Sequence, residues 1–368
     1  MSEHQAGRRL QILAFSRYGR MAPSSRYRIM QFVPLLRAQG IDVEISPLLD
    51  DWYMEHLLTE RRVPLWRLTR AYLRRMRQLR RGHRPDLIWI EKEALPWLPW
   101  PLEQWLLGRD VPVLLDLDDS QFHRYDLHPV HLLRAMFGDK IDRGMAAAGL
   151  VTCGSPYIAE RAKRAGAARV VDLPTAIDLA RYPVRPVPQD PANDTFVLGW
   201  IGTPGNTAYL AALDEPLRRF AAEAPLRIIV IGGKPGILPG LPIEHRPWNE
   251  AAETAWLQEI DAGIMPLPDR PWERGKCGLK LLQYMASSKP AIASPVGVNT
   301  ILVEHGTTGF LADNADEWLA AFRRLRADPA LARSMGMAGR RRVEADYALD
   351  KLAPRLAALM RETIAAAR

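Results

Sequence analysis

The sequence predicts an α/β protein with two Rossmann-like, doubly wound domains. Short apolar runs alternate with amphipathic segments along the 368 residues, as in parallel sheets flanked by helices. The alternation begins again after the proline-rich segment 182–191, which has the composition of a stiff linker. A chain of this length is also long for one hydrophobic core. We therefore expect domains over residues 1–184 and 185–345, with a C-terminal helix over 346–368.

In the first half, an apolar strand precedes an amphipathic helix over 26–39, which Gly40 ends. In the second half, glycine turns follow several strands, and a last helix covers 347–367. Loops after parallel strands lie at the carboxyl edge of a sheet, where open α/β sheets bind ligands. Strands are expected at 10–15, 41–46, 86–90, 111–117, 150–153 and 170–173, then at 196–201, 226–231, 243–248, 261–267 and 291–295.

The composition suits a cytoplasmic globular protein. No apolar run approaches the roughly 18 residues that a membrane span needs. The first fifteen residues lack the apolar core and cleavage site of a signal peptide. Cys153 and Cys277 fall in different predicted domains, which argues against a structural disulfide, and no Cys/His cluster suggests zinc.

The formal net charge of +8 favours an anionic partner, and much of the excess lies between residues 61 and 84. Residues 64–81 predict a basic amphipathic helix. Two interpretations stay open for it: an anionic membrane surface, or a solvated face of a domain helix. Nucleic acid is not expected, because no recognition helix or zinc module accompanies the charge. The predicted apolar stripe is Leu65, Leu68, Tyr72, Met76 and Leu79, opposite Arg67, Arg70, Arg74, Arg77 and Arg81.

The stretch 271–299 predicts a phosphate-binding loop. Gly275 and Gly278 bracket a loop before a helical pattern, and helix N-termini attract anions. Lys276 and Lys280 lie where a cation opposes the helix dipole, so a bound diphosphate would stabilise both. A second glycine turn, at Gly297, precedes another helix. The alternative is that the two lysines decorate an exposed helix start.

Residues 278–312, GLKLLQYMASSKPAIASPVGVNTILVEHGTTGFLA, resemble the donor-binding segment of family 4 glycosyltransferases. These are retaining enzymes of the GT-B fold, in which two Rossmann-like domains face a central cleft and the last helix crosses back to the first domain. The family usually shows two glutamates separated by seven residues. Those positions are Gly275 and Gln283 here. Gln283 can still hydrogen-bond a ribose hydroxyl, and Glu273 is the candidate to replace the other carboxylate.

Further donor-binding residues are expected in the turns of the second domain. Trp248 is a candidate for stacking on the base, although core packing explains a tryptophan there equally well. With Lys276, Lys280 and Gln283, the expected donor-binding residues are Gly202, Thr203, Asn206, Trp248, Gly297, Val298 and Asn299.

Polar residues at strand ends of the first domain predict the acceptor site. Ser25 has the alternative role of a helix cap. Asp118 and Asp119 end a DxD-like segment, for which a divalent cation is one interpretation. We favour a place beside the donor sugar or the acceptor, because a metal–diphosphate site would duplicate the one near Lys280; a structural role such as capping is the third option. The expected acceptor-binding residues are Ser25, Arg26, Arg28, Glu91 and Glu93.

The resemblance implies transfer of a sugar, with retention, from a nucleotide-diphosphate donor, for which we expect UDP or GDP. The arginine-rich helix and the tryptophans near it favour a hydroxyl of a cell-surface glycan or lipid-linked precursor as the acceptor. The resemblance also implies no metal and no cofactor, and a place on the inner face of the membrane fits the basic helix. The alternatives are a noncatalytic sugar-nucleotide sensor or scaffold and a nucleotide-sugar epimerase. The expected catalytic residues are Lys276, Lys280, Glu273, Asp118 and Asp119.

Overall fold

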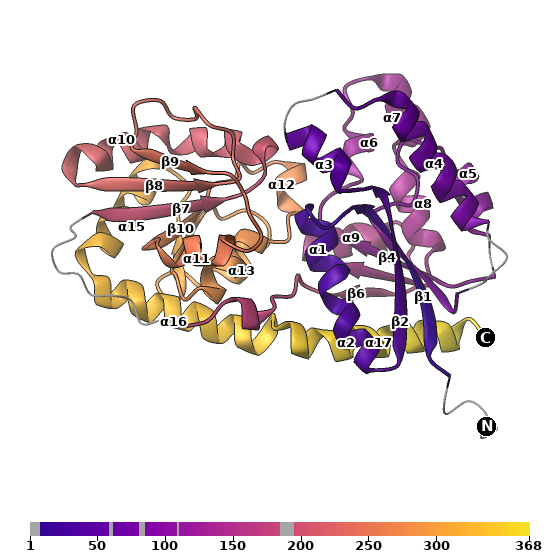
Figure 1. Ribbon diagram of the computed structural model, residues 1–368. Coiled ribbons are helices and arrows are strands. Elements are labelled where there is room, and N and C mark those ends of the chain that lie inside the picture. Colours follow the sequence, from indigo (N-terminus) through magenta and orange to yellow (C-terminus); the bar gives the residue numbers. More distant parts are fainter. Residues whose placement is uncertain (1–7, 59–61, 81–84, 109, 185–194) are drawn as a thin grey trace. The chain divides into compact units, whose positions relative to one another are not determined.

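The computed structural model describes residues 8–58, 62–80, 85–108, 110–184 and 195–368. The chain divides into two compact units, each built on one parallel six-stranded sheet (Figure 1). The N-terminal unit comprises Met1–Ala176, Gly275–Cys277 and Leu349–Arg368. The C-terminal unit comprises Ile177–Arg274 and Gly278–Ala348. The prediction of two doubly wound sheets is confirmed.

The N-terminal sheet has the strand order β2-β1-β3-β4-β5-β6. The order reverses direction between β1 and β3, so the carboxyl ends of these two strands form the topological switch point, where open α/β sheets bind ligands. All neighbouring pairs are parallel. The strands are β1 (Leu10–Tyr18), β2 (Ile41–Leu49), β3 (Leu87–Glu91), β4 (Val113–Leu117), β5 (Leu150–Cys153) and β6 (Val170–Asp172).

The helix expected over 26–39 is wrong as one element. The segment forms three short pieces, because Ile29 leaves the helical region at φ −122° and Pro34 has no N–H group to continue a helix. The helical elements of this unit are α1 (Pro23–Arg28), η2 (Met30–Phe32), α2 (Val33–Ala38), α3 (Asp51–Leu58), α4 (Leu65–Leu79), α5 (Trp100–Leu107), α6 (His123–Asp126), α7 (His131–Phe137), α8 (Lys140–Ala147), α9 (Pro156–Arg164) and α17 (Leu349–Ala366).

The N-terminal sheet is buried on both faces. One face packs Ile12 and Trp89 against the last helix, α17, through side chains such as Leu352, Leu356 and Met360. The other face is covered by residues of α8 and α9. Each fully buried leucine or methionine stabilises the fold by roughly 1.5–3 kcal/mol relative to exposure, so α17 is an integral part of this core.

The C-terminal sheet has the order β12-β11-β10-β7-β8-β9, with its switch point between β7 and β10. Its strands are β7 (Phe196–Ile201), β8 (Leu226–Ile231), β9 (Ile243–Arg246), β10 (Ala262–Met265), β11 (Ala291–Ala293) and β12 (Gly309–Leu311). Its helical elements are η3 (Leu179–Arg181), η4 (Pro204–Leu213), α10 (Asp214–Glu223), α11 (Glu253–Gln258), α12 (Pro271–Arg274), α13 (Leu279–Ala286), α14 (Asn299–Leu302), α15 (Ala315–Ala327) and α16 (Pro329–Asp346).

Tyr284 fixes α13 to the two strands at this switch point. Its hydroxyl accepts a hydrogen bond from the Ile201 amide and donates one to the Ile264 carbonyl, both at 3.2 Å. The ring lies against Gly263, where a Cβ atom would come within 2.2 Å of it. Glycine is therefore required at this point of β10, and Tyr284 holds α13 beside β7 and β10.

Among the described residues, no helix has the length and apolar character that crossing a membrane requires.

Candidate functional site

The turn after β7 lies close to the side chain of Lys280. A Cβ atom on Gly202 would lie 2.5 Å from the Trp200 ring and 3.0 Å from Cε of Lys280, so glycine lets this turn pack against the ring, beside the lysine stem. The Lys280 ammonium lies 5.2 Å from the centre of the Trp200 ring. Lys280 is thereby held at the switch point between β7 and β10.

Helix α13 begins with features that suit an anion. Its N-cap is Gly278, in the left-handed region at φ 71°, and no side chain caps the helix there. Lys280 lies in the first turn, where its charge opposes the positive end of the helix dipole. An anion bound here would accept hydrogen bonds from backbone N–H groups and would be attracted to the lysine.

Two further glycine turns surround the same sheet edge. A Cβ atom on Gly232 would meet the Gly202 carbonyl at 2.5 Å, and one on Gly297 would meet the Arg274 carbonyl at 2.4 Å. Both glycines have positive φ. The backbone of three loops is therefore packed more closely at this edge than any other residue type would allow.

Glu273, the residue expected to replace the missing family glutamate, is buried after β10. Its Oε1 accepts a hydrogen bond of 2.6 Å from the Tyr209 hydroxyl. Its Oε2 is also buried and has no hydrogen-bond partner among the described residues. An orphaned carboxylate oxygen is costly without a partner, and a ligand hydroxyl would supply one.

Several expected donor-binding side chains already have protein partners. Gln283 is buried and donates to the Tyr182 hydroxyl (3.2 Å), and Trp248 donates its indole N–H to Glu253 (2.7 Å). Asn206 donates to the Thr203 hydroxyl at 3.2 Å.

Three expected residues belong to the remaining loops. Asn299 is buried and donates to the Ser294 carbonyl at 3.0 Å, and its neighbour Val298 is buried as well. Lys276 lies in Gly275–Cys277, the segment that groups with the N-terminal unit, so its place beside Lys280 stays a prediction.

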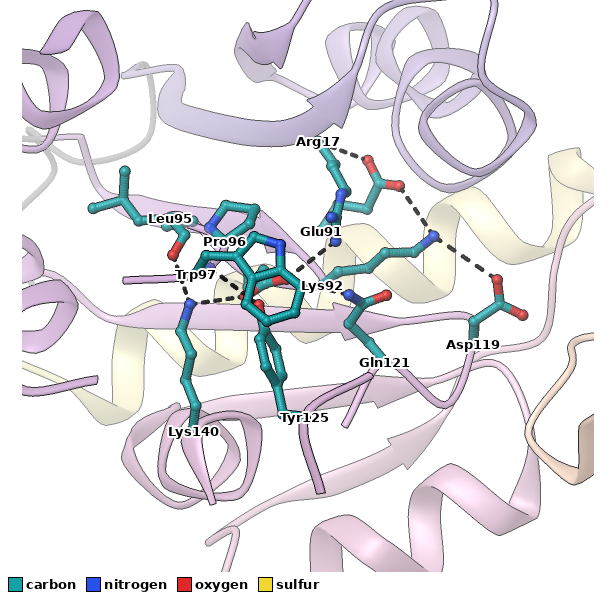
Figure 2. Close-up of polar contacts among 12 residues, drawn as sticks. Arg17, Glu91, Lys92, Leu95, Pro96, Trp97, Asp119, Gln121, Tyr125 and Lys140 are labelled. Carbon is teal, nitrogen blue, oxygen red and sulfur yellow. Dashed lines mark hydrogen bonds and ion pairs between the residues drawn. The ribbon is translucent and has the colours of Figure 1, made fainter. Parts of the chain in front are cut away.

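The N-terminal unit gathers buried charges at its own switch point (Figure 2). Glu93 is the centre of this network of buried charges. From the sequence we expected Glu93 to bind the acceptor and did not predict the network. The Glu93 carboxylate accepts hydrogen bonds from Tyr125 (2.7 Å) and Lys140 (2.8 Å), and from two further donors. These two are Arg17 at 3.1 Å and Gln121 at 3.2 Å. Burial raises the pKa of Glu93, but Lys140 and Arg17 lower it more, so the net shift is downward.

The structure shows the protein partners of four residues that were expected to bind the acceptor, and their role in acceptor binding stays a prediction. Ser25 does not cap a helix; it lies inside α1 and donates to Glu91 Oε2 at 2.6 Å. Arg28 forms a two-pronged ion pair with Asp116 at 2.5 and 2.8 Å and has no exposed donor group. Glu91 and Glu93 are buried in the same way. These groups hold strand ends and α1 together, because buried charges must be paired. Arg26 is buried and donates to the Arg20 carbonyl at 3.1 Å.

Lys92, which sequence reasoning missed, lies beside the two expected catalytic aspartates. Its ammonium is 3.1 Å from Asp118 Oδ1 and 3.9 Å from Asp119 Oδ2. Burial alone would lower the pKa of Lys92. The carboxylates of Asp118, Asp119 and Glu91 raise it by more than burial lowers it, so the net shift is upward and the lysine is charged. Burial raises the pKa of Asp118 to about 6, against the lowering effect of Lys92. No sequence pattern marked Lys92, because its backbone conformation, φ 67°, is visible only in the structure.

In the described part of the chain, no three His, Cys, Asp or Glu side chains lie together in a way that could hold a metal ion.

Helix α4 is the predicted basic amphipathic helix, with two differences. Leu65, expected on the packed stripe, is 78% exposed. Arg75 is instead 1% exposed and donates to the carbonyls of Ser16, Ser46 and Ala94. Burial lowers the pKa of Arg75 to about 9. Arg81 lies outside the described residues, as do Arg61 and Arg84.

Comparison with solved protein structures identifies the fold. Sucrose-phosphate synthase from Thermosynechococcus elongatus superposes with a TM-score of 0.71 at 18% identity, over 97% of this chain and 100% of that one. HepE from Anabaena, solved with UDP and glucose, gives a TM-score of 0.64 at 16% identity over 96% and 100%. Two parallel sheets that match glycosyltransferase structures along nearly the whole chain define a GT-B fold.

The C-terminal sheet also carries a family signature. Residues 197–328 match the family described as Glycosyl transferases group 1. A curated relative, D-inositol 3-phosphate glycosyltransferase from Pseudarthrobacter chlorophenolicus, is 31% identical over 124 residues, which are 33% of this chain and 26% of the relative. The aligned part is thus about a quarter of that relative's length. Residues 197–328 of this chain, which has a GT-B fold, therefore resemble the group 1 glycosyl transferases.

Glu93→Gln tests the network in the N-terminal unit. The variant leaves Arg17 buried without its counter-ion and Lys140 with Glu103 alone at 3.0 Å, so unfolding free energy at pH 7 should fall by about 3–5 kcal/mol. Because the pKa of Glu93 is lowered from 4.5 in the folded state, its contribution is present above pH 4.5 and is lost as the pH falls through the lower folded value. The difference in unfolding free energy between wild type and variant, measured by urea denaturation, should therefore become smaller as the pH falls below 4.5.

The matched control is Glu160→Gln, an exposed carboxylate of the same unit whose pair with Arg164 spans 3.8 Å. It should change stability by less than about 1 kcal/mol. Equal effects of the two substitutions would show that the Glu93 network does not stabilise the unit.

Proposed function

We propose that this protein is a retaining glycosyltransferase that uses a nucleotide-diphosphate sugar, UDP- or GDP-linked, as its donor. The observation that carries the proposal is Lys280, held against Gly202 at the switch point of the domain that matches the group 1 family. HepE, of the same fold, was solved with UDP and glucose. The acceptor we propose is a hydroxyl of a cell-surface glycan or of a lipid-linked precursor.

In the proposed reaction, the bond between the anomeric carbon and the diphosphate breaks while the acceptor oxygen bonds to the same face of that carbon. The acceptor proton passes to a phosphate oxygen of the leaving diphosphate. Lys280 and the backbone N–H groups near Gly202 and Gly297 would stabilise the charge that develops there, as donors in an oxyanion hole do. Lys276 would add a second positive charge. Charge neutralisation by these groups is the reason that we propose a mechanism without a metal ion.

Lys280→Ala should weaken binding of a nucleoside diphosphate. A charge-assisted hydrogen bond contributes about 1.5–3 kcal/mol, which corresponds to roughly 10- to 150-fold in affinity. Calorimetry with UDP and GDP on wild type and variant measures the change.

The control is Lys351→Ala, which removes the same charge from an exposed position of α17. It should bind as wild type does. Unchanged affinity in Lys280→Ala, or no binding of either nucleotide to the wild type, would contradict the proposed donor site.

Glu273 is the proposed contact to the donor sugar. Tyr209 satisfies one of its oxygens, and the other is buried and orphaned, so a sugar hydroxyl can complete the pair. The carboxylate lies on α12, the short helix that follows β10, and Lys280 lies in the first turn of the next helix, α13. Glu273 therefore offers a carboxylate, which Gly275, at the position of the first family glutamate, does not have.

Glu273→Gln should weaken binding of the nucleotide sugar more than binding of the nucleotide alone, because only the sugar contacts this carboxylate. The expected loss is about tenfold for the sugar conjugate, the size of one hydrogen bond to a charged group. Tyr209→Phe, which removes the hydroxyl that orients the carboxylate, should show the same selectivity with a smaller loss. If Glu273→Gln weakens both ligands equally, the carboxylate does not contact the sugar.

Helix α4 offers a proposed membrane contact. Between α3 and α4 lies a hollow of about 900 Å³, lined by Trp52, Trp66 and the arginines of the exposed side of α4. Trp66 is 60% exposed, and Arg67 stacks on Trp52 at 4.0 Å. Exposed apolar and aromatic side chains beside arginines suit an anionic bilayer surface. We accordingly propose peripheral attachment at the inner face of the membrane.

Substituting Arg70, Arg74 and Arg77 by Glu should abolish binding to vesicles that contain phosphatidylglycerol. Each basic residue near an anionic surface contributes about 1 kcal/mol, so losing three should weaken binding by roughly a hundredfold or more. Vesicle sedimentation measures the effect. The charge-matched control replaces three exposed arginines of the C-terminal unit, Arg324, Arg333 and Arg341. Equal sedimentation of the two triple variants would exclude a specific role of α4.

A further inference from the structure

A pocket of about 480 Å³ lies inside the N-terminal unit, between α5, α8 and one face of the sheet. Its floor is formed by side chains of β3 and β4, namely Ile90, Val113 and Leu115. One side of α5 and one side of α8 form the two walls, and the last turn of α17 borders the pocket. Small-molecule sites in proteins have volumes of roughly 300–1,000 Å³, so this pocket is large enough for a ligand.

Small residues on α8 keep the pocket open. Gly144 lines it from the middle of the helix, and Ala147 and Ala148 follow three and four positions later, on the same side. A Cβ atom on Gly144 would lie 3.5 Å from the Trp100 ring, which is an ordinary contact distance. The packing of α5 beside α8 would therefore accept a side chain here, although glycine weakens a helix relative to alanine. The space at Gly144 is not required by close packing, and it adds to the pocket.

The two ends of the pocket differ in exposure. At the open end, Gly108, Gly149 and Ala367 are exposed and lie before β4, before β5 and after α17. At the closed end, Glu103 and Lys140 are buried. Helix α8 runs from the closed end to the open end and is about 12 Å long at 1.5 Å per residue. An elongated ligand can therefore enter at the amino edge of the sheet, opposite the switch point, and reach the buried charges.

Glu103 lacks one hydrogen-bond donor at the closed end. Its side chain is buried, and Oε1 accepts a hydrogen bond of 2.9 Å from the Ala94 amide. Oε2 forms an ion pair of 3.0 Å with Lys140 but has no hydrogen-bond partner among the described residues. Lys140 instead donates to Glu93 at 2.8 Å and to the Leu95 carbonyl at 2.6 Å (Figure 2). A ligand that brings a donor group to this end would satisfy Oε2 of Glu103.

The charges at the closed end are balanced. Glu93 pairs with Arg17 and Lys140, and Lys140 also pairs with Glu103, so two carboxylates meet two cations. A charged ligand would disturb this balance at a place where an unpaired charge is costly. A neutral O–H group can donate to Glu103 without adding a charge.

We propose that this pocket binds a neutral aliphatic alcohol, whose hydroxyl donates a hydrogen bond to Oε2 of Glu103. The chain lies on Leu115, between Leu107 of α5 and Ile141 of α8, where its apolar surface is removed from water. Its far end leaves the pocket at the amino edge of the sheet. This binding goes beyond the proposed function, because it involves neither the proposed donor site near Lys280 nor sugar transfer.

Calorimetry with n-octanol on the whole protein tests the site. Wild type should bind one molecule per chain, and its unfolding temperature should rise as octanol is added. Heptyl methyl ether is an isomer of octanol whose oxygen carries no proton. It should bind at least about tenfold more weakly, because it cannot donate to Glu103.

Gly144→Leu should abolish binding of octanol, because the new side chain fills the pocket beside Trp100. The control is Ala146→Leu, which adds the same side chain at an exposed position of the same helix that does not line the pocket. It should bind octanol as wild type does. If Gly144→Leu does not fold, Ala147→Trp takes its place, since Ala147 is exposed at the open end and a large side chain there blocks entry.

Glu103→Gln distinguishes the hydroxyl contact from a purely structural role. The Ala94 amide holds an oxygen at Oε1, so the side-chain NH₂ group of the variant takes the place of Oε2. That group donates to an ether oxygen as well as to an alcohol oxygen. The folded variant should therefore bind octanol and the ether with similar affinity. A variant that keeps the preference of wild type for octanol would contradict the contact with Glu103.

Three results would overturn the proposal. The first is a folded wild type that shows no saturable binding of octanol. The second is equal affinity of wild type and Gly144→Leu, because the alcohol would then bind elsewhere. The third is equal affinity of wild type for octanol and its ether isomer. Since none of these measurements needs a sugar donor, their outcome is independent of the proposed function.

Discussion

Pairing of buried charges is the constraint on which the N-terminal unit depends. Carboxylates at the ends of β3 and β4 are out of water, and an isolated buried charge is too costly to keep. Each is therefore matched by a cation from a different element: Lys140 on α8 for Glu93, and Arg28 on α1 for Asp116. These pairs also attach helices to the sheet edge. The ion pairs that neutralise the buried charges therefore also fix the positions of the loops in this unit.

In the C-terminal unit, close packing between backbone segments fixes the positions of the loops at the sheet edge. Gly202, Gly232 and Gly297 let three loops and the stem of Lys280 share one edge of the sheet. Tyr284 holds α13 beside β7 and β10 through two hydrogen bonds. A rigid frame around a single lysine suits the binding of a charged group, since little conformational entropy is then lost on binding.

The sequence allowed the strands and the glycine turn before α13 to be anticipated, because both depend on local patterns. β5, β7 and β8 occupy the predicted residues, and Gly278 begins the predicted helix. The partners of the buried charges could not be anticipated. Lys140 is 47 residues from Glu93 in the chain, and only the fold brings them together.

Backbone geometry and burial explain the other misses. The strain at Lys92 has no signature in the sequence. Arg75 was assigned to neither face of its helix, because its spacing does not reveal the three carbonyls that surround it. Pro34 was visible in the sequence, and its missing amide was the signal that the helix expected over 26–39 could not be continuous.

The packing of α17 has a consequence for how the protein is made. Its side chains complete the core that Ile12 and Trp89 begin, yet the ribosome synthesises α17 only after the entire C-terminal unit. Domains often fold in order from the N-terminus as they emerge. Here the first unit to emerge has an unfilled apolar face throughout the synthesis of the second. The C-terminal unit is the first whose core can be complete, and the uncovered face of the nascent N-terminal sheet is the part that chaperones would need to shield.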